Sequence, residues 1–220
     1  MTVPPAGRDG KPRRPYRSAR RTAQAQHTRE RIIAAASEQF AHLGYAATTI
    51  PAVAAAAGVS VGSVELAVGT KTELLKEAID VAIAGDHEPV AVLDRTWAAD
   101  ARAATTLLDF LTAVGRILRP TMTRSAGLVL AAYDAPDTDP ALHDLAHRLA
   151  DQRATTVAWI VDGIRSRADM RDGITRRHAI DQVWLLMDPA VYQRLTQYRG
   201  WSPAKYEKWF TDTVTRLLTA

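Results

Sequence analysis

Two short helical segments joined by a glycine constrain the fold of this chain more than any other feature. Thr49 precedes the apolar run "IPAVAAAA", and a threonine at that place is a good helix N-cap. Ser60 precedes a second run, to about residue 66, and Gly58 between the runs supplies a tight turn. Such a pair forms a helix-turn-helix, in which the second helix projects from the molecule while its neighbours pack behind it.

Helical periodicity continues on both sides of this pair. We expect a first helix from near Thr28 to Gly44, a fourth from the Thr70 capping box to Gly85, and a connector at 85–96. A helix from Thr96 through Leu118 should end at Pro120, where another begins and runs to about residue 132. Further helix starts are marked by Asp139-Pro140, Thr175, Asp188-Pro189 and Ser202-Pro203. No convincing strand is found, so the predicted fold is all-α.

Charge is concentrated at the N-terminus. Residues 1–31 hold nine bases and two acids, a net charge of +7, whereas the whole chain has +4, so the remaining residues sum to −3. The first 20 or so residues are rich in proline and poor in apolar side chains, and we expect them to be disordered. A basic arm on an acidic body suits a polyanion such as nucleic acid, although a solvated leader would have the same composition.

Several other classes of protein are disfavoured. The chain has no cysteine, which excludes a disulfide framework and thiolate metal sites and fits a reducing cytoplasm. Its first ten residues lack the apolar core of a signal peptide. The uncharged stretch 43–64 is interrupted by proline, glycine and hydroxyl residues, so we expect two soluble helices there, no membrane partner and a cytoplasmic location.

Side-chain chemistry suggests how the helix-turn-helix would contact double-stranded DNA. Hydroxyls and a lysine would bind phosphates, Val61 would touch a thymine methyl group, and Glu65 would accept a hydrogen bond from cytosine N4. Gly62 would let the backbone approach the groove closely, and arginines of the arm would lie in the minor groove. The predicted DNA-binding residues are Arg20, Arg21, Arg29, Thr48, Thr49, Ser60, Val61, Gly62, Ser63, Glu65 and Lys71.

The stretch "RIIAAASEQFAHLGYAATTIPAVAAAAGVSVGS…GTKTELLKEAI", about residues 29–79, resembles the N-terminal domain of TetR-family regulators. The resemblance implies an all-helical homodimer that binds a palindromic operator, represses transcription and releases DNA when a small molecule binds. With the basic, disordered arm placed at 1–24, it also implies a three-helix helix-turn-helix DNA-binding domain at 25–84 and a larger helical ligand-sensing and dimerisation domain at 85–220.

The second helix of the helix-turn-helix, at about 60–66, is the one that would read DNA bases, and this reading helix departs from the family pattern. Most members have a base near Val61, a tyrosine at the place of Glu65, and an aromatic or histidine at Ala67. Glu65 would repel a nearby phosphate, so its role as a base reader or as a solvated surface acid stays open. The alternative function is a TetR-like ligand-binding module whose DNA reading is weakened or lost.

The resemblance also assigns roles to aromatic and apolar residues of the C-terminal half. Ligand contacts are expected from Phe110, Tyr133, Trp159 and Trp184, although an aromatic on an apolar helical stripe is more often a plain core residue. The last helices would form a two-fold four-helix interface. Its predicted residues are Val183, Tyr192, Tyr206, Trp209, Phe210 and Leu217.

Catalytic and cofactor motifs are missing from the sequence. His143 and His147 stand four residues apart on a helix, but the zinc-protease glutamate is absent and a third ligand is not identifiable. No phosphate loop, nucleophile elbow or dinucleotide fingerprint occurs. We therefore expect no enzyme activity, no metal and no cofactor.

Overall fold

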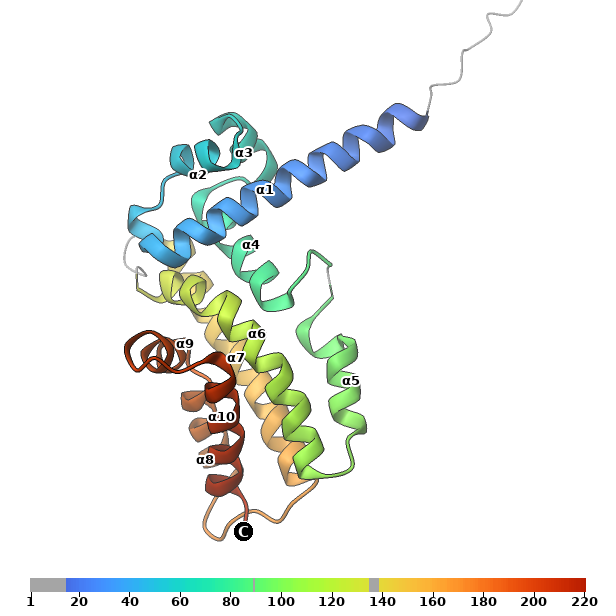
Figure 1. Cartoon of the computed structure of the whole chain (residues 1–220), viewed down its shortest axis with the longest axis vertical. Helices are drawn as coiled ribbons and strands as arrows, with labels where there is room; N and C mark the ends of the chain where they lie inside the picture. Colours follow the sequence, from blue (N-terminus) through green and yellow to red (C-terminus); the bar gives the residue numbers. More distant parts are fainter. Residues whose placement is uncertain (1–14, 89, 135–138) are drawn as a thin grey trace, which may run out of the picture.

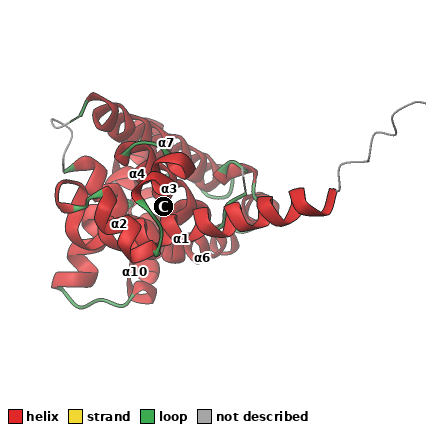
Figure 2. Ribbon diagram, turned by 90° about the horizontal axis from the view of Figure 1, so that it is seen from above, coloured by secondary structure: helices red, strands yellow, loops and turns green. Residues whose placement is uncertain are grey.

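The chain folds into a bundle of helices from which one helix projects (Figure 1). The computed structural model describes residues 15–88, 90–134 and 139–220, with side chains from residue 21 onward. Every named element in these ranges is a helix, as Figure 2 shows, and the only extended pairing among them is an isolated bridge between Met170 and Thr219. The all-α fold predicted from the sequence is thus confirmed.

The elements follow one another with short connections. They are α1 (Pro15–Ala47), α2 (Ile50–Ala57), α3 (Val61–Val68), α4 (Lys71–Ala84), η1 (Val92–Asp94), α5 (Thr96–Ala103), α6 (Leu107–Tyr133), α7 (Pro140–Arg165), α8 (Arg176–Leu186), α9 (Pro189–Gln193), η3 (Arg194–Tyr198, a π-turn) and α10 (Pro203–Leu218).

The predicted capping residues set the starts of the short N-terminal helices. Thr49 Oγ1 accepts a hydrogen bond from the Ala52 amide at 3.2 Å, and Ser60 Oγ accepts one from the Ser63 amide at 3.1 Å. Gly58 between them has φ +64°, which an L side chain rarely adopts. α2 and α3 consequently cross at 100°, the arrangement of a helix-turn-helix.

The start of α1 differs from expectation. The helix begins at Pro15 rather than near Thr28, so the prediction of a disordered arm is wrong for residues 15–24, while residues 1–14 lie outside the described part of the chain. Pro15 is compatible with a first helical position, and the following residues are mostly Ala, Arg and Gln, which favour helix. This half of α1 extends away from the bundle (Figure 1).

The prediction for residues 96–132 is wrong in two places. A short α5 ends at Ala103 and α6 begins after Thr106, whose hydroxyl accepts a hydrogen bond from the Asp109 amide at 3.1 Å. α6 then runs through Pro120 without ending. Proline removes one intrahelical hydrogen bond, but α6 lies centrally, against α1, α4, α7, α9 and α10, so tertiary packing outweighs this local penalty.

Two clusters of buried side chains hold the bundle together. The first unites α1–α4 with the end of α6 and the start of α7, through residues such as Phe40, Leu75 and Leu142. The second joins α5–α10 around Phe110, Tyr206 and others. The helix-turn-helix therefore packs on α1 and α4, and these two helices pack in turn on α6.

Within the described residues, no single helix is long and apolar enough to cross a bilayer, and only the bent pair α2 and α3 has the length and composition of a span when the two are taken together.

Candidate nucleic-acid interface

The outer face of α3 is exposed and carries no base. Val61 is 38% exposed and Leu66 is 91% exposed, and Gly62 and Glu65 are exposed beside them. Val64 is fully buried in the core. α3 therefore presents apolar and acidic groups outward, and Glu65 has no ion pair among the described residues.

The N-terminal end of α3 is exposed together with its cap. Ser60 Oγ lies 2.8 Å from Ser63 Oγ, and both hydroxyls are at the surface side of the first turn. A methyl group added at Gly62 would meet no atom within 4 Å. A polyanion can thus approach this end of the helix closely, where free amides and the helix dipole favour negative charge.

The structure corrects the role expected of Thr48. This residue is 1% exposed, and its hydroxyl donates a hydrogen bond to the Gly44 carbonyl at 2.8 Å. Its side chain closes the end of α1 and does not face a phosphate. The neighbouring Thr49 is exposed at the start of α2, where its side chain can still reach a phosphate.

Arg29 was expected to contact DNA, but its guanidinium forms hydrogen bonds inside the protein. Its Nε and Nη2 donate to the two carboxylate oxygens of Glu77 at 2.7 and 2.5 Å, and its Nη1 donates to the Ala67 carbonyl. Arg31 similarly donates to the Ala57 carbonyl. These two arginines tie the carbonyl ends of α3 and α2 to α1, so they position the reading helix rather than lie in a groove.

The other basic residues differ in how they are placed. Arg21 is exposed on the projecting part of α1, and the side chain of Arg20 lies outside the described residues. Lys71 Nζ lies 4.2 Å from the centre of the Tyr45 ring and 3.5 Å from the Ala46 carbonyl. Desolvation lowers the pKa of Lys71.

Leu66 is the surface residue that sequence reasoning missed. It follows Glu65 and stands four residues after Gly62, so it lies on the same outward face of α3. The signal was available in the sequence, because the helical period that turns Val64 inward turns Leu66 outward. At 91% exposure, Leu66 adds an apolar side chain beside Glu65 on this face.

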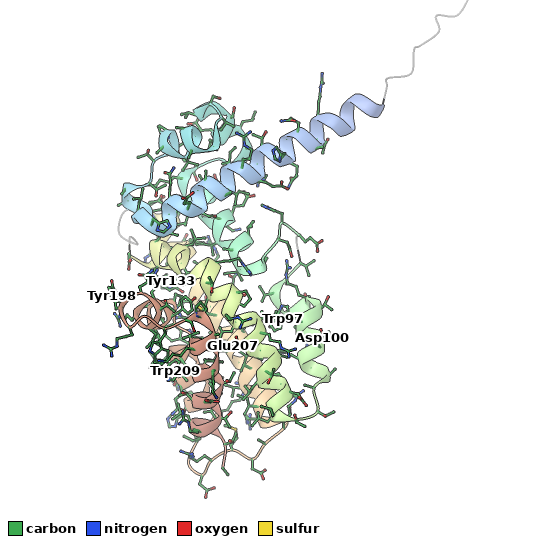
Figure 3. All side chains as sticks on the ribbon, in the orientation of Figure 1. Trp97, Asp100, Tyr133, Tyr198, Glu207 and Trp209 are labelled. Carbon is green, nitrogen blue, oxygen red and sulfur yellow. The ribbon has the colours of Figure 1, made fainter. Side chains whose placement is uncertain are left out.

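The predicted ligand-binding aromatics form two groups. Phe110 is buried and its ring packs on Trp159 at 5.6 Å between centroids, while Trp97 from α5 meets Trp159 edge-on at 5.7 Å. No ring contact within the described residues links this group to Tyr133 or Trp184. Trp97 and Tyr133 lie on well-separated parts of the molecule in Figure 3.

The second group surrounds an arginine. Arg153, 10% exposed, stacks its guanidinium over Trp184 at 3.7 Å, lies 6.0 Å from the centre of the Tyr133 ring, and donates to Asp188 at 2.7 Å. Its Nε is buried without a hydrogen-bond partner among the described residues. Desolvation raises the pKa of Tyr133.

A cavity of about 260 Å³ lies elsewhere, between α1, α4 and the segment after α4. None of the four predicted ligand residues lines it. Its walls are Gln26, Arg29, Glu77, Asp80, Val81, Ala84, Asp86, His87 and Glu88.

Most residues predicted for a dimer interface are core residues of one chain. Tyr206 is fully buried, and its hydroxyl donates to the Leu186 carbonyl at 2.8 Å. Val183, Phe210 and Tyr192 are likewise buried, which corrects their assignment. Trp209 and Leu217 remain half-buried, while Leu185 on α8 and Tyr198 on η3 are 59% and 80% exposed. Tyr198 and Trp209 lie on the same side of the molecule (Figure 3).

Comparison with known proteins agrees with this geometry. Residues 32–78 match the family model described as bacterial regulatory proteins, tetR family. A transcriptional regulator from Saccharomonospora viridis, solved in complex with choline, is 19% identical, with a TM-score of 0.66 over 89% of this chain and 99% of the other. NalD from Pseudomonas aeruginosa, the secondary repressor of the MexAB-OprM multidrug efflux pump, is 18% identical, with a TM-score of 0.66 over 89% and 98%.

No curated protein matches the chain by sequence. The fold and the exposed α3 nevertheless define a helix-turn-helix protein with the architecture of bacterial transcriptional regulators. The resemblance to the TetR family is confirmed at residues 32–78, where the family model matches.

Proposed function

We propose that this protein is a homodimeric transcriptional repressor that binds a palindromic operator through α3 and leaves it when a small molecule binds. The observation that carries the proposal is the exposed outer face of α3, held in place by Arg29 and Arg31. In a helix-turn-helix this face enters the major groove. Residues 25–84 would form the DNA-binding domain and residues 85–220 the ligand-sensing and dimerisation domain.

The positive charge needed for DNA must come mainly from outside α3. Lys71 stands at the first turn of α4, and the projecting half of α1 carries Arg21 in an exposed position. Residues 1–20 supply six more bases and one acid. We expect this segment to contact phosphates beside the groove that α3 occupies, in an orientation set by α1.

Selection of bound fragments from genomic DNA tests the proposal. Full-length protein should enrich a palindromic sequence, and its affinity should fall steeply as salt rises. A variant lacking residues 1–20 keeps every described buried residue, so it should fold normally, bind the same sequence more weakly and show a shallower salt dependence. Binding that ignores sequence in the full-length protein would refute the proposal.

The ligand site is proposed among the aromatic side chains of the C-terminal helices. Trp97, Trp159 and Phe110 form one candidate wall, and Trp184 with Arg153 forms another. An organic cation is the first class to test, since aromatic faces attract cations and the regulator from Saccharomonospora viridis was solved with choline. Quenching of tryptophan fluorescence by choline, together with release of the selected DNA, would support this class.

The dimer is proposed to form over α8, η3 and α10. Leu185, Tyr198, Trp209 and Leu217 leave apolar surface there after the chain has folded. Sedimentation of wild type and of Leu185→Glu tests this surface. The wild type should sediment as a dimer and the variant as a monomer, whereas Leu108→Glu, on α6, should leave the dimer intact.

A ligand-binding module with weakened DNA reading is the second candidate. The exposed carboxylate of Glu65 on the reading face favours it, because an acid repels nearby phosphates. Dimerisation and ligand binding without any enriched DNA sequence would favour this candidate over the first.

A further inference from the structure

His143 and His147 form a pair on the exposed side of α7. Their Nε2 atoms lie 3.0 Å apart, and their rings meet at 4.5 Å between centroids with an interplanar angle of 64°. Both residues are exposed, while Leu142, Leu145 and Leu149 bury the opposite side of the same turns. The buried leucines fix the helix, and the helix fixes the spacing of the two imidazoles.

The distance between the two nitrogens suits a shared metal ion. With metal–nitrogen bonds of about 2.05 Å, nitrogens 3.0 Å apart subtend an angle of about 94° at the metal. That angle is near the 90° of adjacent positions in square-planar or octahedral coordination. Imidazole nitrogens suit both Cu²⁺ and Ni²⁺, and the Irving–Williams order places Cu²⁺ above the other divalent first-row ions in affinity.

We propose that His143 and His147 together chelate one Cu²⁺ or Ni²⁺ ion through their Nε2 atoms. Within the described residues, no group of three or more His, Cys, Asp or Glu side chains could hold a metal, so water fills the remaining positions. Asp144 and Asp151 add negative charge nearby, and Arg148 opposes it. The site is therefore bidentate, open to solvent and exchangeable.

Preorganisation is what distinguishes this pair from two ordinary surface histidines. The two Nε2 atoms already lie side by side in a hydrogen bond, so a bound ion displaces the shared proton and the rings turn to direct both lone pairs at it. A bound ion would also join the first and second turns of α7. We expect it to stabilise this end of the helix and to raise the melting temperature of the protein.

Titration of untagged full-length protein, freed of metal by a chelator, with NiCl₂ or CuCl₂ tests the inference by calorimetry. The wild type should bind one ion per chain. An outer-shell partner alone is worth about 10–100-fold in metal affinity, so His143→Ala and His147→Ala should each weaken binding at least about ten-fold. His178 is an exposed histidine on α8, outside the pair, so His178→Ala is the control and should bind the ion as tightly as the wild type does.

A register control keeps the number of histidines constant. The double variant His147→Ala with Arg148→His moves the second imidazole by one residue, about 100° around the helix and away from His143. It should lose the site while keeping the helical circular dichroism of the wild type. Equal binding by this variant, equal binding by the alanine variants, or no binding by the wild type would each overturn the inference.

Discussion

Thr72 Oγ1 donates a hydrogen bond to Asp139 Oδ2 at 2.7 Å, and this bond joins α4 to the residue that caps α7. Thr72 Oγ1 also forms a hydrogen bond with the Tyr45 hydroxyl, 2.7 Å away. Because the only hydroxyl proton of Thr72 already goes to Asp139, Tyr45 is the donor in this bond. Tyr45 also carries Lys71 over its ring. Lys71, which is proposed to contact a phosphate, is thus linked to the start of α7 through Tyr45 and Thr72.

Thr72→Val should remove both hydrogen bonds while keeping the shape of the side chain. Thr72 is 7% exposed, so we expect the free energy of unfolding to fall by about 1–2 kcal/mol. Urea denaturation measures the change. Exposed Thr112→Val on α6 is the control and should change stability by less than about 0.5 kcal/mol. Equal stability of Thr72→Val and wild type would show that the bonds contribute nothing net.

The ion pair between Asp86 and Arg95 should make stability depend on pH. Two hydrogen bonds from Arg95, at 2.5 and 3.0 Å, are the main cause that lowers the pKa of Asp86 to about 2. Since an unfolded aspartate has a pKa of about 3.9, the pair stabilises the fold above that pH. Its contribution is lost as pH falls from about 4 to about 2.

Asp86→Asn tests this pH dependence by thermal denaturation at several pH values. The melting temperature of the variant should lie below that of wild type at pH 6, and the difference should shrink below pH 4. Asp94→Asn, in the same connector, is the matched control because Asp94 has no ion pair among the described residues. A difference that stays constant down to the lowest pH would contradict the assignment.

Arg29→Ala should lower the stability of the fold by loosening the packing of α3 and α4 against α1. The bidentate pair with Glu77 and the bond to the Ala67 carbonyl are lost together. Arg29 is 39% exposed, so we expect a loss of about 1–2 kcal/mol, below that of a fully buried pair. Arg21→Ala should leave stability unchanged but weaken DNA binding, and chemical denaturation with a DNA titration separates the two roles.

The two glycines of α3 and α7 should respond in opposite ways to alanine. In the free protein Gly62 has open space, so Gly62→Ala should stabilise α3 by up to about 1 kcal/mol. A methyl group at Gly163 would clash with the Phe110 ring, so Gly163→Ala should destabilise the fold by about 1–3 kcal/mol. If Gly62 lies close to DNA, Gly62→Ala should also reduce operator affinity despite its higher stability.

Glu65→Gln distinguishes a base reader from a surface acid. If the carboxylate accepts from cytosine, selection with the variant should lose the preference for that base pair at one position of each half-site, by about 1–3 kcal/mol. If Glu65 only faces phosphates, the variant should bind all sequences more tightly without changing the preferred one. Leu66→Ala, beside it, should weaken binding where a thymine methyl group is contacted.

The helix starts show how far local sequence determined this structure. Asp139-Pro140, Asp188-Pro189 and Ser202-Pro203 all begin helices where predicted, because capping involves only neighbouring residues. Pro120 shows the limit of such reasoning. Its effect on α6 depended on helices far away in sequence, which no local signal at that position reports.

The candidate DNA interface was predictable in part for the same reason. Ser60, Val61, Gly62 and Glu65 lie on the exposed face because the period of α3 places Val64 inside. Thr48 and Arg29 were wrongly expected to face DNA, since their partners Gly44, Glu77 and Ala67 are identified only after α1, α3 and α4 have packed.

The sequence by itself determined that the chain is helical, that a glycine turn joins α2 to α3, and that α3 carries an acid but no base. These are properties of single residues and of their near neighbours. Tertiary structure alone decided which side chains are buried or hydrogen-bonded inside the protein and which stay exposed for binding. Arg29 became an anchor, Tyr206 a core residue, and Leu66 a surface residue, because burial and hydrogen bonding depend on segments that meet only in the folded chain.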